Sequence, residues 1–294
     1  MAAIQDTFTR LEIDSRGVAW LTLDKPDVHN AFDDALIDEL NAHLDRLHGA
    51  AERGEVRVVV LGSQGKHFSA GADLNWMKRM VDYGVDANLK DSRQLSRLMH
   101  RLDTLPCPTL CRVQGAAYGG AVGLAACCDL VIASEAARFC LSEVKIGLSP
   151  AVISPYVQRA IGERQMRRFA LTAEVMDVTT AQVLGLVHEV AGSDELDERV
   201  AVYIDTLLVA SPQGQRATKA LLAEVAREPD SDATRERCCR TISELRVSDE
   251  GQEGLSAFFD KRAPAWQRGD DSSDDSHDAS HDSTDASHRK EPRS

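Results

Sequence analysis

The chain has 294 residues, a hydrophobic fraction of 43% and a formal net charge of −13. This length allows one large domain or two small ones, with apolar residues enough for a sizeable core. The acidic charge disfavours nucleic acid and anionic membranes as main partners. No apolar run is long enough for a membrane span, and the seven cysteines include no CxxC pair. With no N-terminal signal peptide, we expect a cytoplasmic protein with reduced thiols.

Strands alternate with helices up to about residue 193, which is typical of an α/β fold. Strands are predicted over residues 8–14, 18–23, 56–61, 109–113, 130–133 and 138–141, with a last one ending the run 183–190. Helices are predicted over residues 33–47, 74–81, 88–102, 121–127, 154–160 and 163–171. The polar segment 83–93 is expected to be mobile.

The remainder of the chain has a different pattern. Four further helices are predicted, over residues 196–208, 214–226, 232–245 and 249–259. Residues 269–294 are rich in Asp, Ser and His and lack large apolar side chains, so we expect disorder there. The histidines of this tail, His277, His281 and His288, are expected to be solvated, with weak metal binding as the alternative. We divide the chain into a core at 1–193, a helical C-terminal region at 194–268 and an acidic tail at 269–294.

Two turns of small residues each follow a predicted strand. One contains Gly119 and Gly120, and the other is the FSAGAD segment, residues 68–73. A turn of this kind lets the backbone approach a ligand and leaves the first amides of the next helix unpaired. Two such turns have the composition of an oxyanion hole, which binds a developing negative charge on oxygen. The alternative is two tight turns of an α/β core.

Four sequence blocks strengthen the functional interpretation. They are KPDVHNAF (25–32), HFSAGAD (67–73), QGAAYGGAVGLAACCD (114–129) and SEVKIGLSP (142–150). In order and spacing they resemble the enoyl-CoA hydratase/isomerase family, also called crotonases, and the resemblance extends over residues 7–266. It implies a crotonase spiral of ββα units with a helical C-terminal trimerisation region. It also implies a homotrimer or a dimer of trimers that acts on an acyl-CoA, with neither a metal nor a cofactor beyond the CoA of the substrate.

The resemblance also assigns candidate site residues. By motif position, the amides of Ala72 and Gly120 bind the thioester oxygen. The other positions that the motifs place at the substrate or at CoA are Lys25, Ala70, Gly71, Asp73, Leu74, Gly119 and Gly123. For Lys25, near the CoA phosphates by this interpretation, the alternative is an ordinary loop lysine.

The acid–base groups depart from the family pattern. Many hydratases of the family use two glutamates; the second corresponds to Glu143, but the first falls at Gly123. A carboxyl group in a partly apolar pocket has a raised pKa and can alternate between acid and base, so Glu143 alone is the predicted catalytic group. The alternative is a glutamate that caps a surface loop. We expect Gly123 to leave room for a bulkier or branched acyl group.

The run 140–164 narrows the resemblance. It is similar to bacterial methylglutaconyl-CoA hydratases of leucine breakdown and to γ-carboxygeranoyl-CoA-type hydratases of acyclic terpene breakdown. Their substrates carry a second carboxylate, for which Lys145 and Arg93 are candidate partners. We predict hydration of a branched, carboxylated 2-enoyl-CoA. The alternatives are an enoyl-CoA isomerase that uses the single glutamate as a proton shuttle and a non-catalytic acyl-CoA-binding protein.

Overall fold

The computed structural model describes residues 7–267, and the acidic tail with its histidines lies outside them. The main sheet has six strands: β1 (Thr9–Ile13), β2 (Val18–Leu23), β3 (Val58–Ser63), β4 (Thr109–Val113), β6 (Leu130–Ser134) and β9 (Glu189–Ala191), adjacent in that order. Only β1 and β2 pair antiparallel, and the other neighbours are parallel. The predicted α/β architecture is therefore confirmed, and the four middle parallel strands point their carboxyl ends to one edge.

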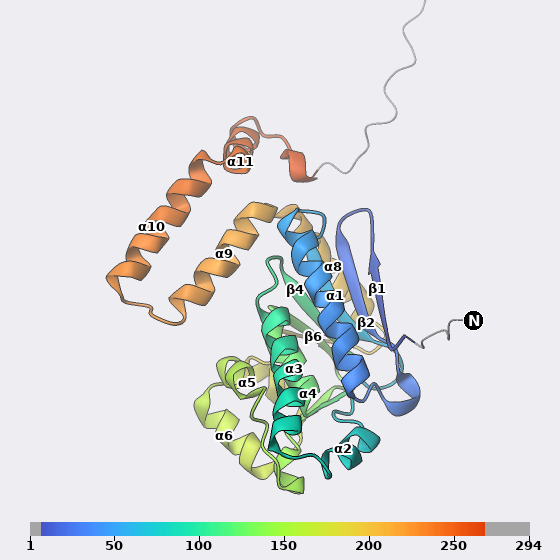
Figure 1. Cartoon of the computed structure of the whole chain (residues 1–294). Coiled ribbons are helices and arrows are strands. Elements are labelled where there is room, and N and C mark those ends of the chain that lie inside the picture. The colour runs from blue at the N-terminus through green and yellow to red at the C-terminus, as the bar shows by residue number, and fades with distance from the viewer. Residues whose placement is uncertain (1–6, 268–294) are drawn as a thin grey trace, which may run out of the picture.

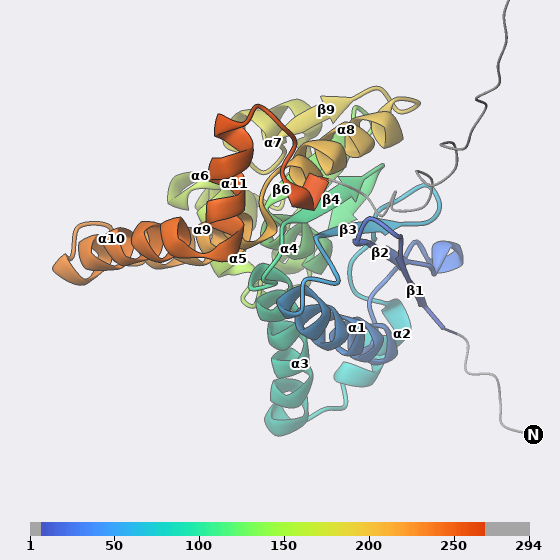
Figure 2. The same cartoon turned by 90° about the horizontal axis from the view of Figure 1, so that it is seen from above.

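Helices cover both faces of this sheet (Figures 1 and 2). On one face lie α1 (Asp34–Glu52), α3 (Val85–Asp103) and α4 (Gly120–Cys127), and on the other lies α8 (Leu196–Val209). In β3, Val59 and Leu61 belong to the core that packs against α1, α3 and α4, while Val58 and Val60 belong to the core that packs against α8. Because both faces are buried, the strand reads as a continuous apolar run. Helix α8 begins three residues after the domain boundary expected at Ser193 and still packs on the sheet of the core.

A smaller sheet joins β5 (Ala116–Tyr118), β7 (Arg138–Cys140) and β8 (Met176–Asp177). Neither β5 nor β8 is predicted by the sequence, because each has only two or three residues and exists through pairing with distant segments. Helix α7 (Val178–Leu184) packs against this sheet, and the remaining helices of this part of the chain are α2 (Leu74–Met80), α5 (Ser154–Ile161) and α6 (Glu163–Thr172). Short 3₁₀ turns occur at η1 (Pro26–Val28), η2 (Glu143–Ile146) and η3 (Ala265–Gln267).

The segment expected to be mobile, residues 83–93, is mostly helical. Helix α3 begins at Val85, three residues before the predicted start. The residues buried on this helix are Leu98, Met99 and Leu102, all in its second half. Apolar periodicity therefore marks only the half that packs on the core, and the exposed first half carries no such signal. No helix in the described part of the chain combines the length and apolar character that crossing a bilayer requires.

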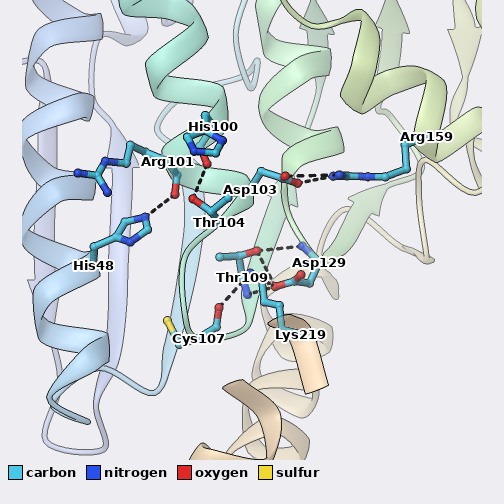
Figure 3. Close-up of polar contacts among 10 residues, drawn as sticks. All are labelled: His48, His100, Arg101, Asp103, Thr104, Cys107, Thr109, Asp129, Arg159 and Lys219. Atoms are coloured by element: carbon cyan, nitrogen blue, oxygen red, sulfur yellow. Dashed lines mark hydrogen bonds and ion pairs between the residues drawn. The ribbon is translucent and has the colours of Figure 1, made fainter. Parts of the chain in front are cut away.

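The last three long helices, α9 (Pro212–Val225), α10 (Asp232–Val247) and α11 (Asp249–Phe259), form an arm that extends from the body (Figure 1). The arm is attached at the amino ends of the strands. Lys219 of α9 donates to Asp129, just before β6, at 2.6 Å and to the Cys107 carbonyl, before β4, at 3.1 Å (Figure 3). Arg57, just before β3, donates to the Ala210 carbonyl, which precedes α9, at 3.1 Å and to the Trp266 carbonyl, which follows α11, at 3.0 Å. A groove of about 1300 Å³ separates α9 from the core.

Candidate active site

The loop between β3 and α2 is tied to the turn that follows β4. Gln114 Nε2, at the end of β4, donates to the carbonyls of Ser63 and Gly65, each at 3.1 Å. Buried Asn30 donates from its side chain to the carbonyls of Gln64 and His67 at 2.8 and 3.0 Å. Side-chain amides therefore satisfy the turning backbone, and both loops are fixed at the carboxyl ends of neighbouring parallel strands. Ligands of open α/β sheets bind at such an edge.

The two small-residue turns are in direct contact. The Ser69 amide donates to the Ala116 carbonyl and the Tyr118 amide donates to the Ser69 carbonyl, both at 3.0 Å. Further along, Gly71 has φ +89°, and a Cβ built on it would lie 3.0 Å from the Tyr118 carbonyl oxygen. Glycine is therefore needed at position 71 for both conformation and space. The two small-residue turns therefore lie side by side.

One amide in the turn formed by residues 68–73 is left unpaired. The Asp73 amide donates to the Phe32 carbonyl, and the Phe32 amide donates to the Gly71 carbonyl, both at 2.7 Å. Between these bonds, the Ala72 amide donates to no acceptor in residues 7–267. Ala72 is exposed, so this donor is open to a ligand.

The second turn presents a matching donor. Gly119 has φ +54° and donates to the Cys140 carbonyl at 2.9 Å, and Gly120 begins α4. Within the described chain the Gly120 amide has no acceptor, as expected for the first residue of a helix. Phe32 connects the two donors, because its backbone pairs on both sides of Ala72 and its ring lies 3.2 Å from a Cβ built on Gly120. Two open amides on adjoining turns can together bind one oxygen as it becomes negative.

Glu143 lies at this junction. A Cβ built on Gly119 would lie 3.2 Å from its Oε1 and 4.0 Å from the Gly71 Cα. Glu143 begins the turn η2, and its Oε2 is buried with no hydrogen-bond partner among residues 7–267. Burial raises the pKa of Glu143 above its ordinary value, because the charged carboxylate loses hydration. Such a carboxyl group is suited to accept and return a proton near neutral pH.

The room expected at Gly123 is not present. A Cβ built there would lie 2.2 Å from Ile153 Cγ2 and 3.2 Å from Met99 Sδ. Both side chains are buried. The expectation that Gly123 opens space for an acyl group is therefore wrong, since an aliphatic side chain from the segment before α5 fills that space.

Other predicted positions have structural contacts. Lys25 forms an ion pair with Asp33, and its ammonium lies 4.5 Å from the centroid of the Phe8 ring. Asp73 caps α2, accepting from the amides of Asn75 and Trp76 at 2.8 and 3.0 Å. These contacts account for both residues without a ligand. The Lys25 ammonium is already neutralised by Asp33.

Four further predicted residues differ in their surroundings. The amide of Ala70 donates to the His29 carbonyl at 2.9 Å. Leu74, the first residue of α2, is 73% exposed. Lys145 on η2 and Arg93 on α3 are both exposed, so each is accessible to a charged group from solvent.

Sequence reasoning missed the residues that hold the turns in place. Asn30 is fully buried with φ +54°, and its Oδ1 accepts from the Lys25 amide at 2.9 Å. Ser69 Oγ donates to the Asn30 carbonyl at 2.7 Å and accepts from the Gly71 amide at 3.2 Å. Ser69 lies between Phe68 and Ala70, and Asn30 precedes Ala31 and Phe32, so a polar residue next to apolar ones is a signal that could have indicated buried side chains that bond to backbone.

Comparisons with known proteins agree with this geometry. Residues 14–269 match the family model described as enoyl-CoA hydratase/isomerase. A putative enoyl-CoA hydratase of Thermus thermophilus is 35% identical over 254 residues, 86% of this chain and 99% of that protein. The 2,3-dehydroadipyl-CoA hydratase of Escherichia coli is 33% identical, covering 84% of this chain and 94% of its own length. The crystal structure of an enoyl-CoA hydratase from Shewanella pealeana superposes with a TM-score of 0.84 at 45% identity, covering 88% of this chain and 96% of that one. The chain therefore belongs to the enoyl-CoA hydratase/isomerase, or crotonase, family and is an enzyme of the enoyl-CoA hydratase type.

Proposed function

We propose that the protein catalyses reversible hydration of a branched, carboxylated 2-enoyl-CoA of the 3-methylglutaconyl-CoA kind. The observation that carries the proposal is the Glu143 carboxyl group beside the turns of Ala72 and Gly120, with a buried Oε2 that has no hydrogen-bond partner among residues 7–267. A thioester oxygen bound to these two amides has its neighbouring carbons within reach of that carboxyl group. The arrangement thus separates charge stabilisation by backbone from proton transfer by one side chain.

The proposed reaction balances with these groups alone. The amides of Ala72 and Gly120 donate to the thioester oxygen, and these bonds strengthen as the oxygen takes up enolate charge. Glu143 accepts a proton from water as the water oxygen bonds to C3 and the C2=C3 electron pair moves into the thioester. The same carboxyl group then delivers that proton to C2 on the same face. The atoms of one water end in the product, and no cofactor beyond the CoA of the substrate is needed.

The substrate class rests on charge and on one relative. A dehydroadipyl group carries a second carboxyl group, and the E. coli protein with 33% identity is named for that thioester. Exposed Lys145 lies two residues after Glu143 and is the candidate partner for such a carboxylate, with Arg93 as the second. Replacing Lys145 with Glu is expected to raise KM for a carboxylated enoyl-CoA and to leave KM for an uncharged one unchanged.

A second candidate function is favoured by the surroundings of Gly123. Glu143 is the acid whose carboxyl oxygen lies beside Gly119, and Ile153 fills the space next to Gly123. A single carboxyl group suffices for an enoyl-CoA isomerase, in which Glu143 removes a proton from C2 of a 3-enoyl thioester and returns it to C4. This reaction uses the same two amides for the enolate oxygen.

Purified full-length protein separates these functions. Linear, branched and carboxylated 2-enoyl-CoA thioesters and a 3-enoyl-CoA are incubated in H₂O and in D₂O, and the enoyl absorbance is followed. We expect loss of absorbance with the highest kcat/KM for 3-methylglutaconyl-CoA. Turnover of the 3-enoyl thioester with deuterium exchange and no water addition would establish the isomerase. Binding of every thioester with no turnover would indicate a non-catalytic acyl-CoA-binding protein.

We infer that the working form is a homotrimer or a dimer of trimers assembled through the C-terminal arm. Phe258 and Phe259 at the end of α11 are 76% and 74% exposed, and Leu222 of α9 and Ile242 of α10 are also exposed. Apolar side chains concentrated on one extended region are typical of an interface. Size-exclusion chromatography with light scattering is expected to give three or six chains, and a monomer at micromolar concentration would contradict the inference.

A further inference from the structure

Gly119 lies just before α4, and Gly123 lies within the first turn of α4, on the same side of the helix as Gly120, three residues earlier. The two positions meet different groups. Beyond Gly119 lies the carboxyl group of Glu143, 3.2 Å from a Cβ built on that glycine. Beyond Gly123 lies Ile153, whose Cγ2 and Cβ would be 2.2 and 2.8 Å from a Cβ built there. One turn of the helix thus separates the reactive carboxyl group from a close aliphatic contact.

The position of Ile153 is fixed by the fold. Its side chain is 2% exposed, and its carbonyl accepts from the amides of Tyr156 and Val157, each at 3.1 Å, at the start of α5. Helix α5 packs directly on α4. Ile153 also follows Glu143 by ten residues in the same connection. A single segment therefore delivers both the carboxyl group and the aliphatic side chain to α4.

We propose that Ile153 is a specificity-determining residue, which closes the site beside Glu143 with an aliphatic wall and leaves Glu143 as its single proton-carrying group. The proposal rests on the proposed function of the same site. With the wall in place, water reaches the acyl carbons only from the side of Glu143, and no second polar group can hold it at Gly123. Proton exchange at C2 therefore competes strongly with addition of water at C3.

The pKa of Glu143 supports this reading. Burial raises it, and no neighbouring charge contributes to that rise. If Ile153 is part of the barrier to water, shortening it should hydrate the carboxylate and lower its pKa. The acidic limb of the kcat/KM profile, which follows ionisation of the base in the free enzyme, should then move to lower pH.

Ile153→Ala tests the proposal, with Ile161→Ala as the matched control. Ile161 is also a buried isoleucine, at the far end of α5, so both changes create a cavity of similar size. For Ile153→Ala we expect the acidic limb to move down by about half a pH unit or more. We also expect water addition relative to C2–deuterium exchange to rise about tenfold. Ile153→Val should behave as wild type, and Ile161→Ala should lower the Tm without moving either readout. The proposal would be overturned if the Ile153→Ala and Ile161→Ala variants had the same acidic limb of kcat/KM and the same ratio of water addition to C2–deuterium exchange.

A substrate-free measurement keeps this test separate from the test of function. Glu143→Gln is introduced into wild type and into Ile153→Ala, and the Tm of all four proteins is measured at pH 4 and pH 8. The gain in Tm from Glu143→Gln at pH 8 should be smaller in the Ile153→Ala background, because the carboxylate there is already hydrated. An equal gain in both backgrounds overturns the role of Ile153, whatever wild type does with enoyl thioesters. Inactive wild type with unequal gains would instead overturn only the proposed function.

Discussion

Two carboxyl groups at opposite ends of the parallel strands differ in every contact. Asp129 Oδ2, at the amino end of β6, accepts from the Thr109 amide at 2.8 Å, from the Thr109 hydroxyl at 2.9 Å and from Lys219 at 2.6 Å. Glu143, near the carboxyl ends, has a buried Oε2 with no partner in residues 7–267. A buried polar group without a partner costs free energy, so its persistence indicates a role outside folding.

The two ends also use different parts of the chain. At the carboxyl ends, backbone amides and the side-chain amides of Asn30 and Gln114 build the turns, and two main-chain donors remain open. At the amino ends, charged side chains attach the C-terminal arm, as Figure 3 shows for Lys219, Asp129 and Thr109. The comparison indicates that two open main-chain donors beside a buried carboxyl oxygen, rather than charge or cavity size, identify the reactive end of this sheet. The groove of about 1300 Å³ beside α9 lies at the other end.

The largest expected effect is from Glu143→Gln. The variant keeps the shape of the side chain but cannot accept a proton, so kcat should fall about 10²–10⁴-fold. Binding of a saturated acyl-CoA should be retained, as isothermal titration would show. Asp129→Asn is the control at the opposite end, with kcat expected to stay near wild type and Tm to fall. A Glu143→Gln enzyme with wild-type kcat would remove the acid–base role of this residue.

A smaller loss is expected from Gly71→Ala, which should displace the turn that presents the Ala72 amide. The added methyl group would lie 3.0 Å from the Tyr118 carbonyl oxygen, and the residue has φ +89°. Loss of one oxyanion donor lowers kcat by about 10²–10³-fold, and a displaced donor should approach that range.

Gly54→Ala is the matched control, since Gly54 has φ +78° and nothing within 4 Å of its added methyl group. Both variants should lose about 1 kcal/mol of stability from the left-handed backbone. Only Gly71→Ala should lose kcat. Equal kcat values in the two variants would show that the turn does not position a catalytic donor.

Local patterns in the sequence predict much of this fold. Strand β4 begins and ends at the predicted residues, and the leucines of α1 lie on its buried face, because period and burial are properties of neighbouring residues. The two turns were also predicted from glycine and alanine content. Short strands such as β5 and β8 were missed, since their two or three residues pair only after distant segments meet.

The details of the site required three-dimensional contacts. Nothing near Gly123 in the sequence indicates that Ile153, thirty residues later, occupies its empty side. Similarly, the role of Phe32 in joining the turns of Ala72 and Gly120 depends on backbone bonds between segments forty residues apart. A glycine in a motif therefore indicates that a side chain does not fit at that position, but only the fold identifies the residue that occupies the space.

At the amino ends, Lys219→Met should affect stability rather than chemistry. The change removes the ammonium that bonds to Asp129 and to the Cys107 carbonyl. We expect a loss of about 1–2 kcal/mol in unfolding free energy, measured by urea denaturation, because hydrogen bonds to a charged group are lost. Lys90→Met, which alters an exposed lysine of α3, is the control and should be near neutral. A change of kcat beyond twofold in the assembled Lys219→Met enzyme would contradict the separation between the two ends.

The smallest expected effect is the pH dependence of stability from Glu143. Its pKa is raised in the folded protein by burial, so between the unfolded and folded pKa values the native state binds more protons than the unfolded state. The contribution of Glu143 to the free energy of unfolding must then fall as pH rises through that window. Above the window, the full cost of burying the charged carboxylate remains. Glu143→Gln removes the penalty, so its Tm should match wild type near pH 4 and exceed it at pH 8. Glu135→Gln, at an exposed glutamate, should show no such difference between the two pH values. A Glu143→Gln variant less stable than wild type at pH 8 would mean that the folded protein favours the charged carboxylate, which the buried and unpartnered Oε2 argues against.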